Sequence, residues 1–325
     1  MVGNLNSRER EAITENLRSL KQSIGSMAIW MGYGYHFTDL NNIPSILQNN
    51  VIYSRRDAES QRLIASEVGD AEILSRTAAD IQEYVRFYWR PRTPMLYGIE
   101  GIRASDQYLY KGRCAIPVYL CVPLAELFVN PTVRFSDRNA ASPYVNFGST
   151  LEFIQGIPFE KVFHDRVFAP SDRDEIIARR QAEIQVHHSF QLTPNTFILV
   201  RSPAELSMLR EKLPATIYGM WNNRIRISTR VPAFFKRWLF VDRIERHGDS
   251  VHLYWNSQAT VKAVGKVTLR VRFENLDTGY SVDMHQPPIQ WDGTPELHYN
   301  GLKSYTWRIT VRIEDTVAYT GFLYP

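Results

Sequence analysis

The sequence lacks the features that mark several large classes of protein. Among its 325 residues there are 2 cysteines, Cys114 and Cys121, too few for a disulfide framework and without the spacing of a zinc site. No run of about 18 apolar residues occurs, and residues 1–6 contain no apolar signal core. These absences predict a protein without a membrane segment or a secretory signal, and they favour a reducing cytoplasm.

Several common catalytic motifs are also missing. The chain contains no GxxxxGK[ST], GxGxxG, HExxH or GxSxG pattern, so the P-loop, Rossmann, zincin and α/β-hydrolase classes have no motif support. Its 8 histidines are scattered, and the one adjacent pair, His187 and His188, would point to opposite faces of a strand. We therefore expect no metal cofactor.

The net charge of +4 conceals an uneven distribution. Residues 201–272 hold 14 Lys and Arg against 5 Asp and Glu, whereas residues 1–200 are close to neutral and residues 273–325 are acidic. A block this basic indicates a surface for a polyanion, and we assign Arg224 and Arg226 to nucleic-acid binding. A solvated basic face is the competing interpretation.

The spacing of apolar residues changes along the chain. Residues 7–25 repeat apolar positions at helical spacing, and a mixture of helical and strand patterns follows. Beyond about residue 214 the period shortens to two, as in TLRVRF and RITVRI, with no helical segment. The sequence predicts an α+β protein with an N-terminal helix (1–27), a mixed body (28–214), and a basic segment with an all-β, sandwich-like domain (215–325).

Local patterns place further elements within the body and beyond it. Aromatic and β-branched residues predict strands at 84–89, 95–99 and 183–190. A capping box that begins at Ser202 predicts the start of a helix. The apolar run at 234–241 predicts one of the strands of the all-β domain.

Two segments combine residue types that bind nucleotides. In YHFTDLNNIPSIL, His36 and Thr38 end a strand just before a helix start, where backbone amides can meet an anion or a ribose. In YVRFYWRPRTPMLY, aromatic rings alternate with Arg90 and Arg92, so rings can stack on a base while guanidinium groups hold phosphates. A core histidine beside a helix cap and an aromatic strand with a basic loop are the structural alternatives.

A third segment places a carboxylate at the start of an apolar strand. In IIARRQAEIQV, Glu183 directly follows a basic stretch, where it could stabilise a developing positive charge. The alternative is a surface glutamate paired with Arg179 or Arg180.

In order and spacing, the three segments resemble the DarT family of DNA ADP-ribosyltransferase toxins. The family has YHITHIDNLxxIL, FYFCPRSPMLY and KQAEFLV, and this chain has YHFTDLNNIPSIL, FYWRPRTPMLY and RQAEIQV. The similarity covers roughly residues 33–190. Departures include Trp89 and Arg90 where the family has Phe and Cys, and Asp39 in place of a second His.

The resemblance implies an ADP-ribosyltransferase fold, a split pair of small sheets that encloses NAD in a cleft. It implies that Glu183 is the catalytic glutamate and that Arg76 positions the cofactor by clamping its pyrophosphate. The remaining NAD contacts would be His36 and Thr38 at the adenosine-side ribose, Asn42 at the following helix start, and Tyr88 with Met95 around the nicotinamide and the target base.

The expected reaction is transfer of ADP-ribose from NAD to a base in a single-stranded nucleic acid. Cleavage of the bond between ribose C1′ and nicotinamide develops oxocarbenium character, which a carboxylate stabilises without a metal. A base must be unpaired to enter a pocket. The family favours DNA, and RNA stays open because phosphate contacts are shared. The resemblance further implies a cytoplasmic toxin of a toxin–antitoxin or anti-phage system, with an antitoxin protein as partner.

Two other function classes remain compatible with the sequence. One is ADP-ribosylation of a protein, with the β-domain as the recognition module. The other is a non-catalytic nucleic-acid-binding protein. Labelled NAD separates modification of a protein from modification of a nucleic acid, because label on a nucleic acid is lost to nuclease and label on a protein is lost to protease. Glu183→Ala tests the non-catalytic class, since only a catalytic protein loses transfer in that variant.

Overall fold

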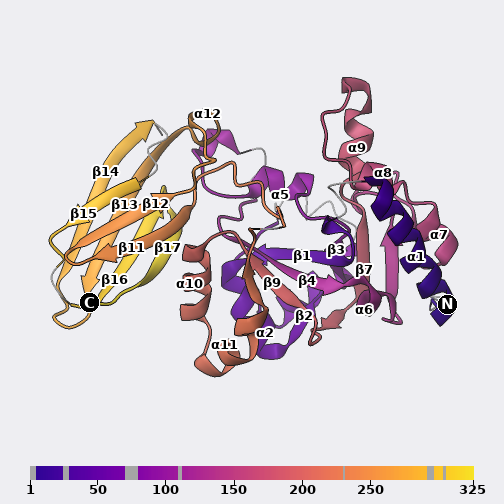
Figure 1. Ribbon diagram of the computed structural model, residues 1–325, viewed down its shortest axis with the longest axis horizontal. Coiled ribbons are helices and arrows are strands. Elements are labelled where there is room, and N and C mark those ends of the chain that lie inside the picture. Colours follow the sequence, from indigo (N-terminus) through magenta and orange to yellow (C-terminus); the bar gives the residue numbers. More distant parts are fainter. Residues whose placement is uncertain are drawn as a thin grey trace. The chain divides into compact units, whose positions relative to one another are not determined.

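The computed structural model describes residues 5–24, 29–69, 80–108, 112–229, 231–290, 296–302 and 305–325. The chain forms two compact units (Figure 1). The first comprises Met1–Tyr97 and Tyr119–Ile198, and the second comprises Gly98–Val118 and Leu199–Pro325. This division differs from the boundary expected at residue 214, because residues 98–118 and the chain from 199 onward group together.

The first unit combines short helices with two sheets, in agreement with the predicted α+β class. Its helices are α1 (Ser7–Ile24), α2 (Ile43–Asn49), α3 (Arg55–Ser60), α5 (Pro94–Ile99), α6 (Leu124–Phe128), α7 (Leu151–Gln155), α8 (Phe159–Val162) and α9 (Arg173–Arg179). Its strands are β1 (Tyr33–Asp39), β2 (Val51–Tyr53), β3 (Tyr84–Tyr88), β4 (Pro117–Pro123), β5 (Val133–Ser136), β6 (Phe147–Gly148), β7 (Glu183–His187), β8 (Ser189–Gln191) and β9 (Phe197–Val200). The ranges of α5, β4 and β9 extend across the limits of the two units.

The two sheets of this unit separate at His188. The larger sheet contains the neighbouring strands β4-β1-β3-β7-β5-β6, and β2 pairs with β8 in a sheet of its own. His188 has a φ of 62°, a left-handed conformation that is uncommon for a residue other than glycine. This turn ends the pairing of β7 with β3 and lets the next residues pair with β2, so that one run of chain contributes to both sheets.

The predicted strand at residues 95–99 is wrong, because this segment forms helix α5. The Leu96 amide donates a hydrogen bond to Thr93 Oγ1 at 3.2 Å, and Pro94 is the first helical residue. A threonine cap followed by proline is a strong helix start. That start prevails over the strand preference of the neighbouring aromatic residues.

The second unit begins with helices and continues with two antiparallel sheets. Its elements are α10 (Pro203–Lys212), α11 (Ala215–Trp221), β10 (Ile225–Ile227), β11 (Val241–His247), β12 (Ser250–Trp255), α12 (Val261–Val264), β13 (Lys266–Asn275), β14 (Ser281–Gln290), β15 (Glu296–Asn300), β16 (Trp307–Ile313) and β17 (Thr316–Leu323). The capping box predicted at Ser202 is present, since its hydroxyl accepts from the Glu205 amide at 3.2 Å. The expectation of no helix beyond residue 214 is wrong, since α11 and α12 lie there. The strand expected at residues 234–241 is displaced, because β11 begins at Val241 and continues to His247.

Strands β11 to β17 of the second unit form two layers. Strands β11-β12-β15 form one sheet and β14-β13-β16-β17 form the other. Buried and exposed side chains alternate along β12, β13 and β16, so each of these strands buries one face. The Phe273 and Tyr299 rings, one from each sheet, lie 5.4 Å apart. The sandwich-like architecture predicted from the two-residue period is therefore present.

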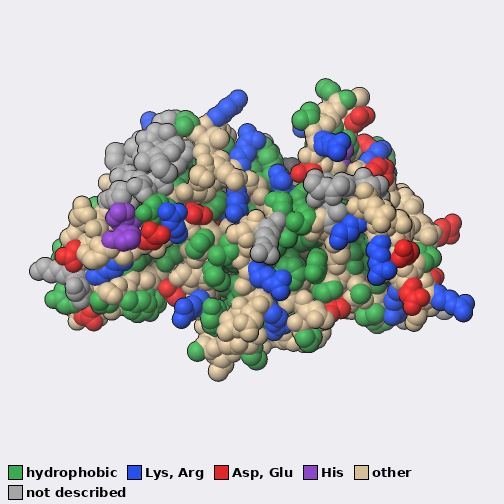
Figure 2. Space-filling model, viewed as in Figure 1, with side chains coloured by type: hydrophobic (Ala, Val, Ile, Leu, Met, Phe, Trp, Pro, Cys, Tyr) green, Lys and Arg blue, Asp and Glu red, His purple; other side chains and the backbone are tan. Residues whose placement is uncertain are grey.

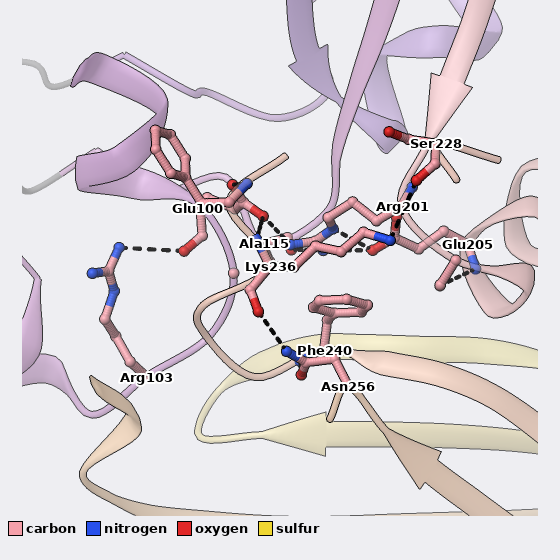
Figure 3. A network of polar contacts seen from close by, with 12 residues as sticks. Glu100, Arg103, Ala115, Arg201, Glu205, Ser228, Lys236, Phe240 and Asn256 are labelled. Carbon is pink, nitrogen blue, oxygen red and sulfur yellow. Dashed lines mark hydrogen bonds and ion pairs between the residues drawn. The ribbon is translucent and has the colours of Figure 1, made fainter. Parts of the chain in front are cut away.

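A buried ionic network links distant segments of the second unit (Figure 3). Arg201 donates to Glu205 Oε1 through Nε at 2.8 Å and lies 3.4 Å from Glu100 Oε1. Glu100 also accepts the backbone amides of Phe235 at 2.9 Å and Lys236 at 3.1 Å. Residues 98–118 therefore belong to this unit through polar contacts as well as packing.

No helix in the described residues has the length and hydropathy needed to cross a membrane.

Candidate active site

A cavity of about 220 Å³ lies in the first unit beside β1 and β3. It is lined by residues of both strands together with residues of α2, β2, α3 and the segment 63–69. The five predicted NAD contacts other than Arg76 line this one cavity: His36, Thr38, Asn42, Tyr88 and Met95. Residues from the first and second sequence segments are therefore brought together in three dimensions.

His36 lies on β1, and its ring contacts the backbone of β3. Its Nδ1 is 3.0 Å from the Arg86 carbonyl oxygen. Because a carbonyl only accepts, Nδ1 carries the hydrogen and the neutral ring leaves Nε2 as an acceptor. Burial lowers the pKa of His36 below its ordinary value of 6.5, and the charge of Arg86 acts in the same direction. The histidine is therefore a neutral hydrogen-bond acceptor at physiological pH.

Asn42 holds the segment that closes one side of the cavity. Its Oδ1 accepts the amides of Ala65 and Ser66, both at 2.9 Å. Its Nδ2 donates to the Ser66 carbonyl at 2.8 Å and to Thr38 Oγ1 at 2.9 Å. Asn42 thus shapes the wall of the cavity in which the resemblance places the cofactor.

Tyr88 and Met95 form an apolar part of the cavity wall. The Tyr88 hydroxyl lies 3.6 Å from the Met95 sulfur, and the Tyr88 ring stacks on Phe37 with centroids 6.0 Å apart. Burial raises the pKa of Tyr88 to about 12, so the phenol stays neutral. Aromatic and thioether surfaces of this kind suit a flat heteroaromatic ring.

Glu183 begins β7 opposite Tyr88 of β3. Its side chain is 0% exposed, and Oε2 accepts from Arg86 Nε and from Gln185 Nε2, both at 2.8 Å. Oε1 accepts from a second nitrogen of the Arg86 guanidinium. The alternative of a surface glutamate paired with Arg179 or Arg180 is therefore wrong, because the carboxylate is buried and its partner is on β3.

The sequence reasoning did not identify Arg86 or Gln185. Both are two residues from a predicted site residue on the same strand, so they share a face with Tyr88 and Glu183 respectively. The two-residue alternation of side chains along a strand is the sequence signal that could have identified both residues. The register that sets Arg86 opposite Gln185 follows from the fold alone.

Arg76, the predicted cofactor-positioning arginine, lies outside the described residues. Among the described residues, two arginines line the cavity, and each is bound to a carboxylate. Arg86 pairs with Glu183, and Arg55 donates to Glu67 through two nitrogens at 2.9 and 2.6 Å. Both guanidinium groups are thus held in fixed positions at the cavity wall.

The structure contradicts the assignment of Arg90 to nucleic-acid binding. Arg90 is 1% exposed, lies over the Trp30 ring at 4.5 Å and pairs with Asp165 at 2.9 Å. Burial lowers its pKa to about 10. Arg92, with a side chain 27% exposed, pairs with the same aspartate at 3.3 Å. Arg90 is therefore an interior residue of the first unit.

The basic block at 201–272 is partly internal. Arg201 is buried in its ionic network, whereas Arg226 is exposed on β10 and Arg224 lies over the Trp221 ring at 3.6 Å. Figure 2 shows Lys and Arg interspersed with Asp and Glu on the face in view. Only part of the sequence surplus is therefore available to a polyanion.

Among the described residues, no group of three or more His, Cys, Asp or Glu side chains could hold a metal ion. Cys114 and Cys121 are both buried and take part in no disulfide bond.

Comparison with known proteins decides the family. The model of the family described as "ssDNA thymidine ADP-ribosyltransferase, DarT" matches residues 35–235. The chain belongs to the DarT family. Its residues in the cavity and at Glu183 all lie within the matched range, and the resemblance predicted from the three sequence segments is confirmed.

Three relatives illustrate the similarity. A DNA ADP-ribosyl transferase of Thermus aquaticus is 30% identical over 136 residues, which cover 39% of this chain and 59% of the relative. A fusion of a DNA ADP-ribosyl transferase with a DNA ADP-ribosyl glycohydrolase, from Thermosipho africanus, is 33% identical over 81 residues, covering 22% of this chain and 21% of the fusion. The solved Thermus sp. 2.9 DarT in complex with ADP-ribosylated ssDNA is 21% identical with a TM-score of 0.49, covering 63% of this chain and 96% of that one. The chain thus matches less than two thirds of the length of the two curated relatives.

Proposed function

We propose that the chain is an NAD-dependent ADP-ribosyltransferase that modifies a thymidine base in single-stranded DNA. The observation that carries this proposal is the buried, doubly held carboxylate of Glu183 next to the cavity lined by the five predicted NAD contacts. The description of the matched family supports the base and the strand.

The chain's own residues supply the parts that the reaction needs. The Glu183 carboxylate stabilises the oxocarbenium character that develops at ribose C1′ as nicotinamide departs, and it can take the proton of the incoming base nitrogen. His36 accepts from a ribose hydroxyl through Nε2. Tyr88 and Met95 provide the flat apolar surface for an aromatic ring, and Arg76 serves as the pyrophosphate clamp. NAD is a co-substrate in this scheme.

Labelled NAD and short oligonucleotides test the proposal. The full chain is incubated with [³²P]NAD and a single-stranded DNA that contains one thymidine. Label that resists protease and is released by nuclease, together with free nicotinamide, is the expected result. Matched substrates are the duplex, the same strand without thymidine, and the RNA counterpart. Label confined to protein, or equal label on the strand without thymidine, contradicts the proposal.

The neutral state of His36 predicts a pH dependence of NAD binding. Since its pKa in the folded protein lies below 6.5, the ring stays an acceptor above that pH and loses acceptor capacity once the pH falls through the lowered pKa. We expect a constant Kd for NAD from pH 8 to about 6.5 and weaker binding once the pH falls through the lowered pKa, measured by calorimetry. His36→Gln should bind with little pH dependence over this range. A wild-type affinity that stays constant down to the pH at which the protein unfolds would contradict the assignment.

Reversal of charge at Arg224 and Arg226 tests the second unit as a strand-binding surface. The double variant Arg224→Glu/Arg226→Glu should weaken single-strand binding about tenfold or more and lower the salt dependence of log Kd by one to two units. The matched control is Arg270→Glu/Arg272→Glu, two exposed arginines that are also two residues apart and lie on β13 of the same unit. If both double variants weaken single-strand binding equally, the effect comes from net charge, and the assignment of Arg224 and Arg226 to a strand-binding surface is wrong.

A partner that reverses the modification is a further part of the proposal. The Thermosipho africanus relative joins a DNA ADP-ribosyl transferase to a DNA ADP-ribosyl glycohydrolase in one chain. We infer a corresponding antitoxin that hydrolyses ADP-ribose from DNA, and a toxin role for this chain in the cytoplasm. Co-expression with a glycohydrolase of this type should restore growth to cells that express the chain.

A further inference from the structure

Arg86 lies between the buried carboxylate of Glu183 and the cavity. Its side chain is 28% exposed and lines the cavity, whereas Glu183 is 0% exposed and is absent from the lining. The guanidinium contacts both carboxylate oxygens, one through Nε at 2.8 Å and the other through a terminal nitrogen. The Arg86 guanidinium thus separates the Glu183 carboxylate from the cavity.

The two oxygens of Glu183 are held differently. Oε2 accepts from Gln185 Nε2 as well as from Arg86. Gln185 is itself oriented, since its Oε1 accepts from Arg134 Nε at 2.7 Å and its amide nitrogen therefore points toward Glu183. For Oε1 the structure records Arg86 as the partner. Release of the Arg86 contact would leave Oε2 anchored and Oε1 available.

Among the residues that the structure describes, the other titratable groups near the pair form no direct ion pair with Glu183. His36 of β1 is neutral and bonds to the backbone of Arg86, and the Tyr88 phenol of β3 is neutral. Arg134 of β5 reaches Glu183 only through Gln185. Among the described residues, Arg86 is the one cation within ion-pair distance of Glu183.

A carboxylate removed from water favours its neutral form unless a cation lies beside it, and such burial can move a pKa by several units. Burial acts to lower the pKa of Arg86 as well, but the Glu183 carboxylate outweighs that effect and raises it above its ordinary value. The guanidinium therefore stays charged at every pH at which the protein is folded. A protonated Glu183 could neither stabilise an oxocarbenium ion nor accept a proton.

We propose that Arg86 is the positioning residue of the catalytic carboxylate: it keeps Glu183 ionised, and it yields Oε1 to a ribose hydroxyl of the substrate while Gln185 retains Oε2. The proposal rests on the proposed function for the role of Glu183. The ion pair between Arg86 and Glu183 is present in the protein without substrate.

The first test measures the ionisation of Glu183 without any substrate. In protein labelled with [5-¹³C]glutamate, the Glu183 resonance is identified by its loss in Glu183→Gln, and its chemical shift is followed against pH. Arg86→Gln should raise the titration midpoint by about one pH unit or more, and Arg86→Lys should restore most of the wild-type value. The matched control Arg243→Gln removes an arginine that pairs with Glu245 in the second unit and should leave the midpoint unchanged. An unchanged midpoint in Arg86→Gln overturns the proposal.

The second test measures kcat/KM for NAD consumption against pH in the same variants. The acid limb of Arg86→Gln should move upward by the shift seen in the titration, with the activity at high pH retained within about tenfold. Loss of activity at every pH in a folded Arg86→Gln would place Arg86 on the reacting atoms and overturn a positioning role. If the wild type consumes no NAD, the proposed function fails while the titration still decides the role of Arg86.

A folding control completes the design. If Arg86→Gln alone does not fold, the double variant Arg86→Gln/Glu183→Gln is prepared. A folded double variant shows that the guanidinium compensates the buried carboxylate, as proposed. A double variant that is also unfolded assigns Arg86 to the architecture of the sheet and overturns the proposal.

Discussion

Glu183→Gln is expected to lower ADP-ribosyl transfer by about 10³-fold, which corresponds to roughly 4 kcal/mol of transition-state stabilisation. Glutamine has the shape of glutamate but carries no charge, so it can neither balance the oxocarbenium ion nor take a proton from the base. Transfer to a single-stranded oligonucleotide and the release of nicotinamide are both measured. The Kd for NAD should change far less than the rate, because the carboxylate acts mainly in the transition state.

The variant should keep its fold, since the Arg86 side chain that loses its ion partner is 28% exposed and retains access to water. Glu67→Gln is the matched control. That carboxylate also holds an arginine at the cavity wall, Arg55, and carries no proposed catalytic role. Toxicity on expression should disappear with Glu183→Gln. Wild-type rates in a folded Glu183→Gln would remove the catalytic assignment.

Arg201→Met is expected to lower the free energy of unfolding by about 3–5 kcal/mol. The substitution leaves the Glu100 and Glu205 carboxylates inside the second unit without their cation (Figure 3). Burial already raises the pKa of Glu205 despite the neighbouring guanidinium, so removal of that guanidinium favours protonation further. The loss should therefore be larger at pH 8 than at pH 5, as measured by urea denaturation of the full chain.

Two comparison variants make this result specific. Arg243→Met breaks a pair whose side chains are 43% and 41% exposed, and it should change stability little. The triple variant Arg201→Met/Glu100→Gln/Glu205→Gln removes the buried charges together and should recover part of the loss. If Arg201→Met and Arg243→Met have equal effects, the network contributes no special stability.

Much of the candidate site was predictable because its motifs are local. His36 and Thr38 alternate on one strand, and Asn42 follows at the next helix start, so a short run of sequence sets their relative positions. Tyr88 and Met95 are likewise seven residues apart within one segment. The strand at 183–190 also followed from its apolar character, although the turn at His188 divides it between two sheets.

The failures arose where tertiary contacts decide the outcome. Arg90 occurs in a basic, proline-rich loop and was assigned to a ligand, but it lies in the interior over Trp30, paired with Asp165. A guanidinium in a loop has the same local sequence signature whether it is exposed or buried.

By itself, the sequence determined the α+β class, the family and the residues that meet in one cavity, because each rests on local motifs or on the period of apolar residues. The tertiary structure alone decided that Arg86 holds Glu183, that Arg201 is buried with two glutamates, and that residues 98–118 group with the second unit. The register that sets Arg86 near Glu183, the burial of Arg201 and the grouping of residues 98–118 all depend on packing between segments that are far apart in the chain.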